Sequence, residues 1–198
     1  MSTAHVLDRI FNVSLVGVGG QGILLTSDVL ALVAMHAGLD VKKSEIHGMS
    51  QRGGSVISQV RFGAQVHSPI IPDGQSDVLV SFERTEALRY AHLAKPGATI
   101  LVNDMDRIPV TVSSGLQAPV QDADRRLAAY PGLKLIDANP LAIQAGNLRA
   151  ANIVLLGALS AFVPFAEEHW QSALRERIPA KLLDVNLRAF AAGRTAAG

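Results

Sequence analysis

The stretch "VGVGGQGILLTSDVL", from Val16 to Leu30, decides how the rest of the chain is interpreted. It continues the apolar run "NVSLVG", which ends in glycine and is typical of a strand buried on both faces. After the glycines, apolar side chains recur at helical spacing as far as Gly38, a residue that can end a helix. The stretch therefore predicts a strand, a glycine-rich turn and a helix, the opening unit of an α/β fold.

The same alternation continues along the chain. We expect the segment 55–63 to be a half-exposed strand that pairs with 64–71 as an antiparallel hairpin, and 139–162 to be one long helix. Asn139 is its predicted N-cap and Pro140 its first residue. Further strands are predicted at 41–46, 77–82, 98–104 and 133–138, and further helices at 83–94, 122–130, 167–178 and 180–193. The fold class predicted is α/β, a three-layer Rossmann-like sheet, mostly parallel with an antiparallel hairpin, and a helical C-terminal part.

Composition limits the domain organisation and the function classes. The chain has 198 residues, 48% of them hydrophobic, which predicts a single domain over 1–198. Its net charge of +1, from 18 basic and 17 acidic residues, gives no electrostatic reason to expect nucleic acid or anionic lipid as a partner. The absence of cysteine excludes disulfides and iron–sulfur clusters ligated by this chain. The histidines lack metal-binding spacing, so no metal site is expected.

Targeting and membrane signals are not evident in the sequence. The N-terminus has an early acidic residue and no apolar region before a small-residue cleavage site, so we expect a cytoplasmic protein. The most apolar run, Ile153 to Phe165, has thirteen residues, fewer than the roughly 20 that a membrane-spanning helix needs. It is interpreted as a buried core helix. The "AAGRTAAG" tail is expected to fray.

Three spaced glycines, Gly17, Gly19 and Gly22, fit the G-x-G-x-x-G pattern between a strand and a helix. Such a turn can bring backbone N–H groups close to a phosphate, or it can simply be a tight turn that requires glycine. A dinucleotide-binding unit would continue with a second crossover helix, and no clear ribose-binding acid is present. A phosphate-binding P-loop would place Lys and Ser/Thr where Ile23 and Leu24 stand.

A second informative stretch, "HGMSQRGG", covers His47 to Gly54. Arg52 followed by Gly53 and Gly54 offers a guanidinium beside unhindered backbone N–H groups, a combination suited to a carboxylate or phosphate. The alternative is a glycine turn with a surface arginine. His47 is either a proton carrier or an ordinary loop residue.

Together, the G-x-G-G-Q-G turn and the H-G-M-x-Q-R-G-G loop resemble the gamma domain of the 2-oxoacid:ferredoxin oxidoreductases. The "HGMSQRGG" form is most similar to the small (beta) subunit of the indolepyruvate branch, and the resemblance covers essentially the whole chain. It implies a subunit, inactive alone, of a complex that oxidatively decarboxylates an aryl 2-oxoacid to an acyl-CoA and reduces ferredoxin. Alternatives are a gamma subunit of a pyruvate or 2-oxoglutarate enzyme, a free-standing NAD(P)- or flavin-binding protein, and a scaffold subunit without ligand contact.

The resemblance also assigns the cofactors. It places thiamine diphosphate and the iron–sulfur clusters in a large catalytic (alpha) subunit, with coenzyme A as co-substrate, and it assigns no catalytic residue to this chain. Two loops are then expected to face coenzyme A or the partner subunit. Their residues are Gly17, Gly19, Gly20, Gln21 and Gly22 in the first loop, and His47, Gln51, Arg52, Gly53 and Gly54 in the second.

Overall fold

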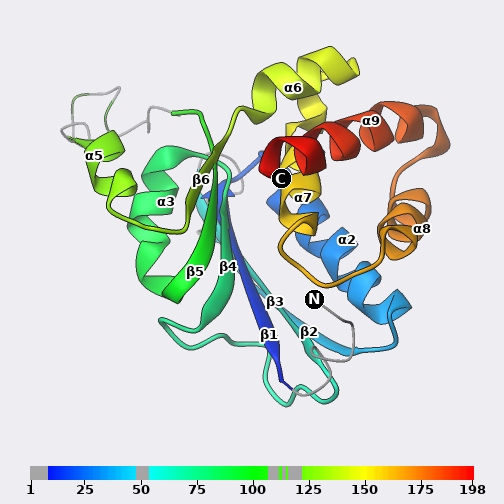
Figure 1. Ribbon diagram of the computed structural model, residues 1–198, viewed down its shortest axis with the longest axis horizontal. Helices are drawn as coiled ribbons and strands as arrows, with labels where there is room; N and C mark the ends of the chain where they lie inside the picture. The colour runs from blue at the N-terminus through cyan, green and yellow to red at the C-terminus, as the bar shows by residue number, and fades with distance from the viewer. Residues whose placement is uncertain (1–8, 48–53, 107–111, 113–114, 116–121) are drawn as a thin grey trace.

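The computed structural model describes residues 9–47, 54–106, 112, 115 and 122–198, which form three layers (Figure 1). The middle layer is a sheet of six strands within this part of the chain. Helices α3 and α5 cover one face, and α2, α7, α8 and α9 cover the other. The strands are β1 (Phe11–Val18), β2 (Asp40–His47), β3 (Ser55–Gly63), β4 (Ser76–Ser81), β5 (Ala94–Asn103) and β6 (Leu133–Ile136). The helices that cover the two faces of the sheet are α2 (Ile23–His36), α3 (Arg84–Tyr90), α5 (Ala123–Ala128), α7 (Ala151–Ser160), α8 (Glu167–Arg177) and α9 (Ala180–Ala197).

The strand order is β2-β3-β1-β4-β5-β6, with β1, β4, β5 and β6 parallel. β3 runs antiparallel to both of its neighbours, β1 and β2. The chain leaves β1 through α2 on one face and leaves β4 through α3 on the other, so the crossovers change face between these two strands. In open α/β sheets, ligands bind outside the carboxyl ends of the strands at such a point.

The antiparallel hairpin is formed by β2 and β3, so the predicted pairing of 55–63 with 64–71 is wrong. β3 lies inside the sheet and is largely buried, which also contradicts the prediction of a half-exposed strand. The residues after it return over the sheet as a loop: the Ile71 N–H donates to Gln59 Oε1 at 3.0 Å, and Arg61 donates to the Ser68 and Ile70 carbonyls. This loop covers Gln59 and Arg61, the polar residues of β3 whose alternation with apolar ones predicts a half-exposed strand.

The predicted helix 139–162 is divided into three pieces. Gly146 ends the first piece at φ +113°, a conformation that glycine adopts without a side-chain penalty. Asn147 is extended, and its Oδ1 accepts a hydrogen bond from the Arg149 N–H at 3.0 Å, so a new turn begins there. The pieces are α6 (Ala138–Ala145), the 3₁₀ turn η2 (Leu148–Ala150) and α7. The break turns the chain toward the carboxyl ends of the strands.

Two predicted helix ends are also wrong. α6 is preceded by Asp137 at the N-cap position, so Asn139 and Pro140 lie inside its first turn. The C-terminal tail does not fray, because α9 continues to Ala197. The tail is held by packing on α7: a Cβ added at Gly193 would lie 1.8 Å from the Val154 carbonyl oxygen, so the two backbones touch.

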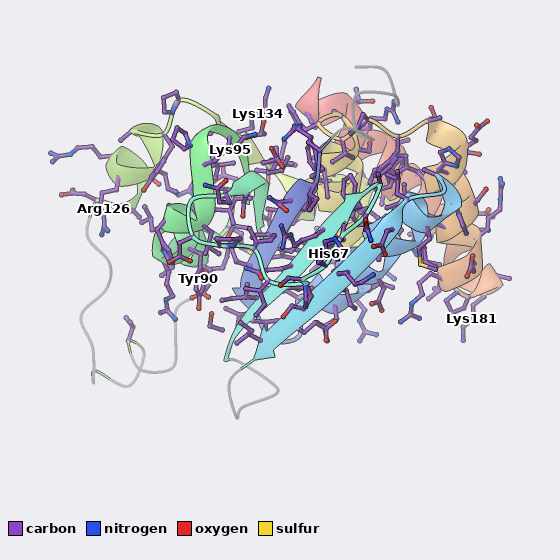
Figure 2. The ribbon with its side chains drawn as sticks, turned by 90° about the horizontal axis from the view of Figure 1, so that it is seen from below. His67, Tyr90, Lys95, Arg126, Lys134 and Lys181 are labelled. Carbon is purple, nitrogen blue, oxygen red and sulfur yellow. The ribbon has the colours of Figure 1, made fainter. Side chains whose placement is uncertain are left out.

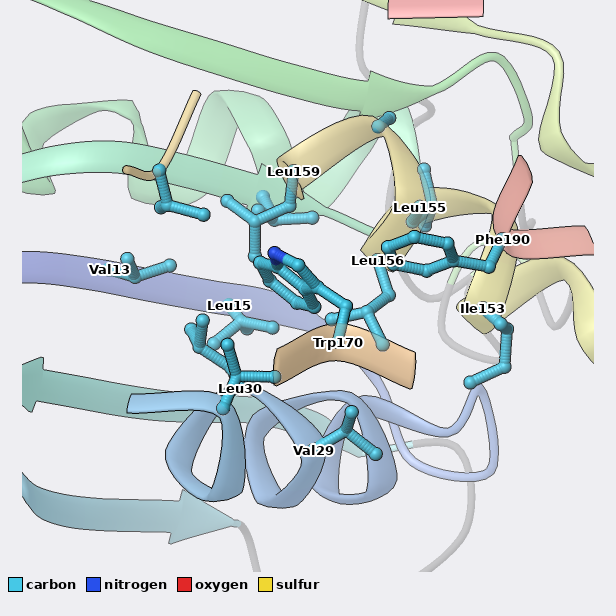
Figure 3. Packing of buried hydrophobic residues seen from close by; sticks show 14 of the residues in the cluster. Val13, Leu15, Val29, Leu30, Ile153, Leu155, Leu156, Leu159, Trp170 and Phe190 are labelled. Carbon is cyan, nitrogen blue, oxygen red and sulfur yellow. The ribbon is translucent and has the colours of Figure 1, made fainter. Parts of the chain in front are cut away.

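The largest buried cluster lies between the sheet and the helices on the α2 face (Figure 3). Trp170 of α8 is fully buried in its centre, with its ring centroid 5.5 Å from that of Phe190 on α9. Figure 3 shows Leu30 of α2 and Leu156 of α7 beside the indole. Every α7 residue from Asn152 to Ser160 is buried, which confirms the predicted core helix.

The charged side chains of the described residues are spread over the surface. Figure 2 shows Arg126 of α5 and Lys181 of α9 at opposite ends of the molecule. The edge strand β2 carries alternating charges that pair along the strand, with Lys42 2.5 Å from Asp40 and Lys43 2.5 Å from Glu45. No helix in the described part of the chain is long and apolar enough to cross a membrane.

At the opposite end of the sheet from the glycine turn, a buried carboxylate joins several segments. Asp77 of β4 accepts hydrogen bonds from Arg9 at 2.7 Å, from the Asn12 backbone N–H at 2.8 Å and from Lys95. Burial raises the pKa of Asp77, but the hydrogen bonds from Lys95, Arg9 and Asn12 outweigh it, so its pKa lies below the usual value. The ionised carboxylate therefore ties the start of β1 to β4 and β5.

Candidate functional site

A cleft of about 690 Å³ opens at the carboxyl ends of β1, β4 and β5, where the crossovers change face. The glycine turn after β1 forms one wall, and η2 with the ends of α8 and α9 forms the opposite wall. Its polar lining comes from Gln21, Asn103, Asn139, Asn147, Arg149, Asn152, Arg177 and Asn186. Its apolar lining includes Leu25, Phe82, Met105, Leu148, Leu155, Ile178 and Leu182. The cleft is thus amphipathic and sits at the position expected for a ligand in this class of sheet.

The glycine turn is tight and is joined to the second loop. Gly20 and Gly22 have φ values of +99° and +85°, which strongly favour glycine. The Gly19 N–H donates to the Gly54 carbonyl at 2.8 Å, and the Gln21 N–H donates to the Val18 carbonyl at 3.2 Å. The structure therefore brings Gly54 of the second predicted loop against Gly19 of the first.

Gln21 fills the inside of this turn with its own side chain. Its Oε1 accepts a hydrogen bond from the Val18 N–H at 2.7 Å, and its Nε2 donates to the Phe82 carbonyl at 3.4 Å. A Cβ at Gly17 would lie 2.6 Å from Gln21 Oε1 and 2.8 Å from Phe82 Cβ. Gly17 and Gln21 are thus explained by the packing that joins the ends of β1 and β4.

Asn152 explains the last glycine of the turn in the same way. A Cβ at Gly22 would lie 2.7 Å from Asn152 Nδ2, which donates to the Gly22 carbonyl at 3.4 Å. This amide bridges to neighbouring backbone, as buried side-chain amides usually do. Within the part of the chain that the structure describes, no side chain caps the N-terminus of α2, and Gly22 and Leu25 at that end line the cleft.

The two arginines of the cleft have different surroundings. Among the described residues, the exposed guanidinium of Arg149 has no hydrogen-bond or ion-pair partner. Arg177 donates from Nη2 to Asp28 Oδ2 at 2.9 Å, and Asp28 also accepts from Lys43. No aspartate or glutamate is among the described residues that line the cleft, so its charge is positive.

The ion pairs around Asp28 fix the position of Arg177. Burial raises the pKa of Asp28, but hydrogen bonds from Lys43 and Arg177 outweigh it and hold the pKa below its usual value. Burial lowers the pKa of Lys43, but its hydrogen bonds to Asp28 and Glu45 raise it by more than burial lowers it. The pKa of Lys43 therefore lies above its usual value. Asp28 and Lys43 are therefore both charged near neutral pH, and Arg177 is bonded to the same carboxylate. They join β2, α2 and the end of α8.

The second predicted loop is described only at its ends. His47 is the last residue of β2, and its backbone pairs with that of Val56. Gln51, Arg52 and Gly53 lie outside the described residues. Where the chain resumes, the Ser55 hydroxyl contacts the Glu86 carboxylate and lies 2.9 Å from the Tyr90 hydroxyl, both on α3. The loop therefore begins and ends on fixed elements beside the glycine turn.

Comparison with known proteins identifies the family. Residues 12–196 match the family described as pyruvate ferredoxin/flavodoxin oxidoreductase. The chain belongs to the pyruvate ferredoxin/flavodoxin oxidoreductase family. It is 44% identical to the indolepyruvate oxidoreductase subunit IorB of Thermococcus kodakarensis and 43% identical to that of Pyrococcus horikoshii, with 94% of this chain and 96% of each relative covered.

Solved structures of the oxidoreductase family share the fold. A gamma subunit of a keto/oxoacid ferredoxin oxidoreductase from Geobacter sulfurreducens matches with a TM-score of 0.69 and 26% identity, covering 94% of this chain and 98% of that one. The 2-oxoglutarate:ferredoxin oxidoreductase of Magnetococcus marinus matches with a TM-score of 0.72 and 22% identity, covering 96% of this chain but 31% of that one. The α/β class and the mixed sheet predicted from the sequence are confirmed.

Sequence reasoning missed much of the cleft. Four lining residues were not predicted as site residues, because they lie in segments far apart in the sequence that meet only at the cleft. They are Asn103, Asn139, Arg149 and Arg177. Asn103 had a signal, because it is the last residue of a buried parallel strand and the carboxyl ends of such strands lie at one edge of the sheet. The arginines had none, since their positions depend on the helix break at Gly146 and on how α8 packs.

Proposed function

We propose that this chain is the small subunit of an indolepyruvate:ferredoxin oxidoreductase, a subunit that carries no redox cofactor itself. One observation carries the proposal: identity of 38–44% to four proteins named indolepyruvate oxidoreductase subunit IorB, over more than nine-tenths of this chain and of each relative. The 2-oxoglutarate and ketoisovalerate relatives are only 28–30% identical, which favours the indolepyruvate branch over the other oxoacids.

The complex would oxidatively decarboxylate an aryl 2-oxoacid to an acyl-CoA and pass electrons to ferredoxin. Thiamine diphosphate, in the large partner subunit, supplies the electron sink for decarboxylation. The chain has no cysteine, so iron–sulfur clusters held by thiolates also belong to the partner. A ketoisovalerate oxidoreductase subunit VorA of Methanothermobacter thermautotrophicus matches over 91% of this chain but 35% of its own length. In that protein the corresponding region is therefore joined to a longer polypeptide, which supports a role within an assembly.

The contribution of this chain is binding and orientation. Gln21 holds the glycine turn rigid by joining β1 to β4, so the turn can present a fixed wall to a neighbouring group. His47, Gln51, Arg52, Gly53 and Gly54 would face coenzyme A or the partner subunit beside that wall. Arg52 would contact a phosphate of coenzyme A or the substrate carboxylate.

The alternative of a free-standing NAD(P)- or flavin-binding protein has weaker support. In a dinucleotide fold both neighbours of β1 are parallel to it, and one of them ends in the ribose-binding acid. Here β4 is parallel to β1, but the strand on its other side is the antiparallel β3. The packing of Gln21 and Asn152 also accounts for Gly17 and Gly22 without a pyrophosphate. A nucleotide that bound this chain would raise its stability by about 2.7 kcal/mol at 100 times Kd, so a thermal-shift screen with NAD(H) and FAD tests the alternative.

Reconstitution tests the proposal directly. The purified chain is mixed with its large subunit, and indolepyruvate- and coenzyme A-dependent reduction of a viologen dye is measured. We expect activity only when both subunits are present, with pyruvate and 2-oxoglutarate as poor substrates. A large subunit that is fully active alone, or a mixture that oxidises pyruvate in preference, contradicts the assignment.

The second loop has its own test in the assembled complex. Arg52→Ala should raise the apparent KM for coenzyme A or for the oxoacid while leaving assembly intact, because a charged hydrogen bond to an anion is lost. Arg126→Ala, on α5 and outside the lining of the cleft, serves as the control. Unchanged kinetics for Arg52→Ala would remove this residue from the site.

A further inference from the structure

Large apolar side chains are exposed on the elements that line the cleft. Leu148 of η2 and Leu182 of α9 line it and are 52% and 39% exposed. Leu24, in the first turn of α2, is 41% exposed, and Ile143, on the neighbouring α6, is 60% exposed. Scattered apolar residues are normal on a protein surface, but several on the elements around one concave site indicate an interaction surface. We call Leu148 and Leu182, the two that line the cleft, the apolar rim.

The cleft inside the apolar rim is positively charged. Arg149 projects from η2 next to Leu148 and has no partner among the described residues, and the described lining contains no carboxylate. Arg177, at the end of α8, adds a second guanidinium to the lining and is held there by Asp28. The group complementary to these arginines is an anion. The molecule that contains this anion must also cover the apolar rim.

The remaining polar lining consists of side-chain amides. Asn103, Asn139, Asn147, Asn152 and Asn186 all line the cleft. Each amide has both a donor and an acceptor, the same pair of groups that alternates along a polypeptide backbone. A small anion would satisfy the arginines and leave the apolar rim in water. A polypeptide segment can pair with the amide groups that the described chain leaves without a hydrogen bond, such as the Asn147 Nδ2 and the Asn152 Oδ1, and it can cover the apolar rim at the same time.

We propose that this cleft and its apolar rim form the docking surface for a segment of the catalytic subunit that carries an acidic side chain flanked by apolar ones. The acidic group pairs with Arg149, which has no ion-pair partner among the residues that the structure describes. The apolar neighbours cover Leu148 and Leu182. This inference rests on the proposed function, because it requires a catalytic subunit as the partner.

The test is a titration of the small subunit against its purified catalytic subunit, followed by size-exclusion chromatography and the viologen assay. Leu148→Asp combined with Leu182→Asp should weaken assembly at least about tenfold, because two charges would be placed in an apolar contact. Arg149→Glu should weaken it by a similar factor at low salt, and by less at high salt, because the lost attraction is screened.

Matched controls are present on the same chain. Met35 and Ile70 are 58% and 61% exposed and lie away from the cleft, so Met35→Asp with Ile70→Asp should assemble normally. Arg126→Glu, on α5, controls for the charge reversal. Circular dichroism and thermal unfolding establish that each variant is folded, which is expected because all the changed side chains are exposed.

Three outcomes would contradict these proposals in different ways. Rim variants that assemble as tightly as the wild type overturn the docking surface and leave the proposed function intact. Rim variants that assemble normally but raise the KM for coenzyme A overturn it in favour of a small anionic ligand in the cleft. A wild-type chain that neither binds the catalytic subunit nor supports its activity overturns the proposed function itself.

Discussion

The contact between α7 and α9 allows a quantitative prediction for Gly193→Ala. The added Cβ would lie 1.8 Å from the Val154 carbonyl oxygen and 2.6 Å from its carbon, whereas real Cβ contacts do not fall below 3.0 Å. The contact is reciprocal, because a Cβ at Gly157 would lie 2.0 Å from the Phe190 carbonyl oxygen. Backbone atoms cannot rotate away, so the two helices must separate along their length.

Two opposing contributions decide the sign of the effect. Replacing glycine by alanine inside a helix stabilises it by about 1 kcal/mol when nothing is in the way. Overpacking a close contact costs about 1–3 kcal/mol, and here the obstruction is backbone on both helices, which favours the upper part of that range. We therefore expect a net loss of about 2 kcal/mol in the free energy of unfolding, or about 4–8 °C in Tm for a chain of this size.

The assay is urea and thermal unfolding followed by circular dichroism. Ala191→Gly, at an exposed position of the same helix, measures the helix-propensity contribution alone and should cost about 1 kcal/mol. If Gly193→Ala is as stable as the wild type or more stable, the gain in helix propensity equals or exceeds the cost of overpacking. That result would refute the close crossing of α7 and α9.

Two further perturbations test other parts of the fold. Asp77→Asn should lower the free energy of unfolding by about 2 kcal/mol at pH 7, measured by urea unfolding, because Lys95 and Arg9 lose an ionised partner. The pKa of Asp77 is depressed in the folded state, so the contribution of this carboxylate to the free energy of unfolding is fully present above the unfolded pKa of about 3.9. That contribution is lost as the pH falls through the folded pKa. The difference in the free energy of unfolding between Asp77→Asn and the wild type should therefore narrow below about pH 4. Gln21→Ala should cost about 1–2 kcal/mol, since the Val18 N–H loses its acceptor. The control is Gln171→Ala, which removes a solvent-exposed hydrogen bond to Glu167. Unchanged stability together with reduced activity of the complex would instead place Gln21 on a ligand.

The elements predicted best from the sequence were those whose pattern depends on local neighbours. The strand at β1, the glycine turn and α2 followed from one apolar run and three glycines, and their observed positions agree closely. β4 and β5 were recognised in the same way, because strands buried on both faces are continuously apolar. The family resemblance rested on two loops and was confirmed by matches along nearly the whole chain.

The errors occurred where distant contacts override local pattern. β3 alternates like a half-exposed strand, yet the loop that reaches Gln59 buries its polar face. The apolar residues around Gly146 and Asn147 suggested an unbroken helix, but a positive φ at one and an extended backbone at the other end it. The cleft could not be predicted for the same reason, because Arg149 reaches it only through that break.

The pairing of charges along β2 also limits how copies of this chain can associate. An open edge strand of eight residues would otherwise offer its unpaired backbone groups to the edge of another molecule. Lys42 and Lys43 oppose such a continuation, because docking a second strand would remove water from their ion pairs with Asp40 and Glu45. At the other edge, β6 has only four residues. We therefore expect copies of this chain not to associate by pairing the edges of their sheets.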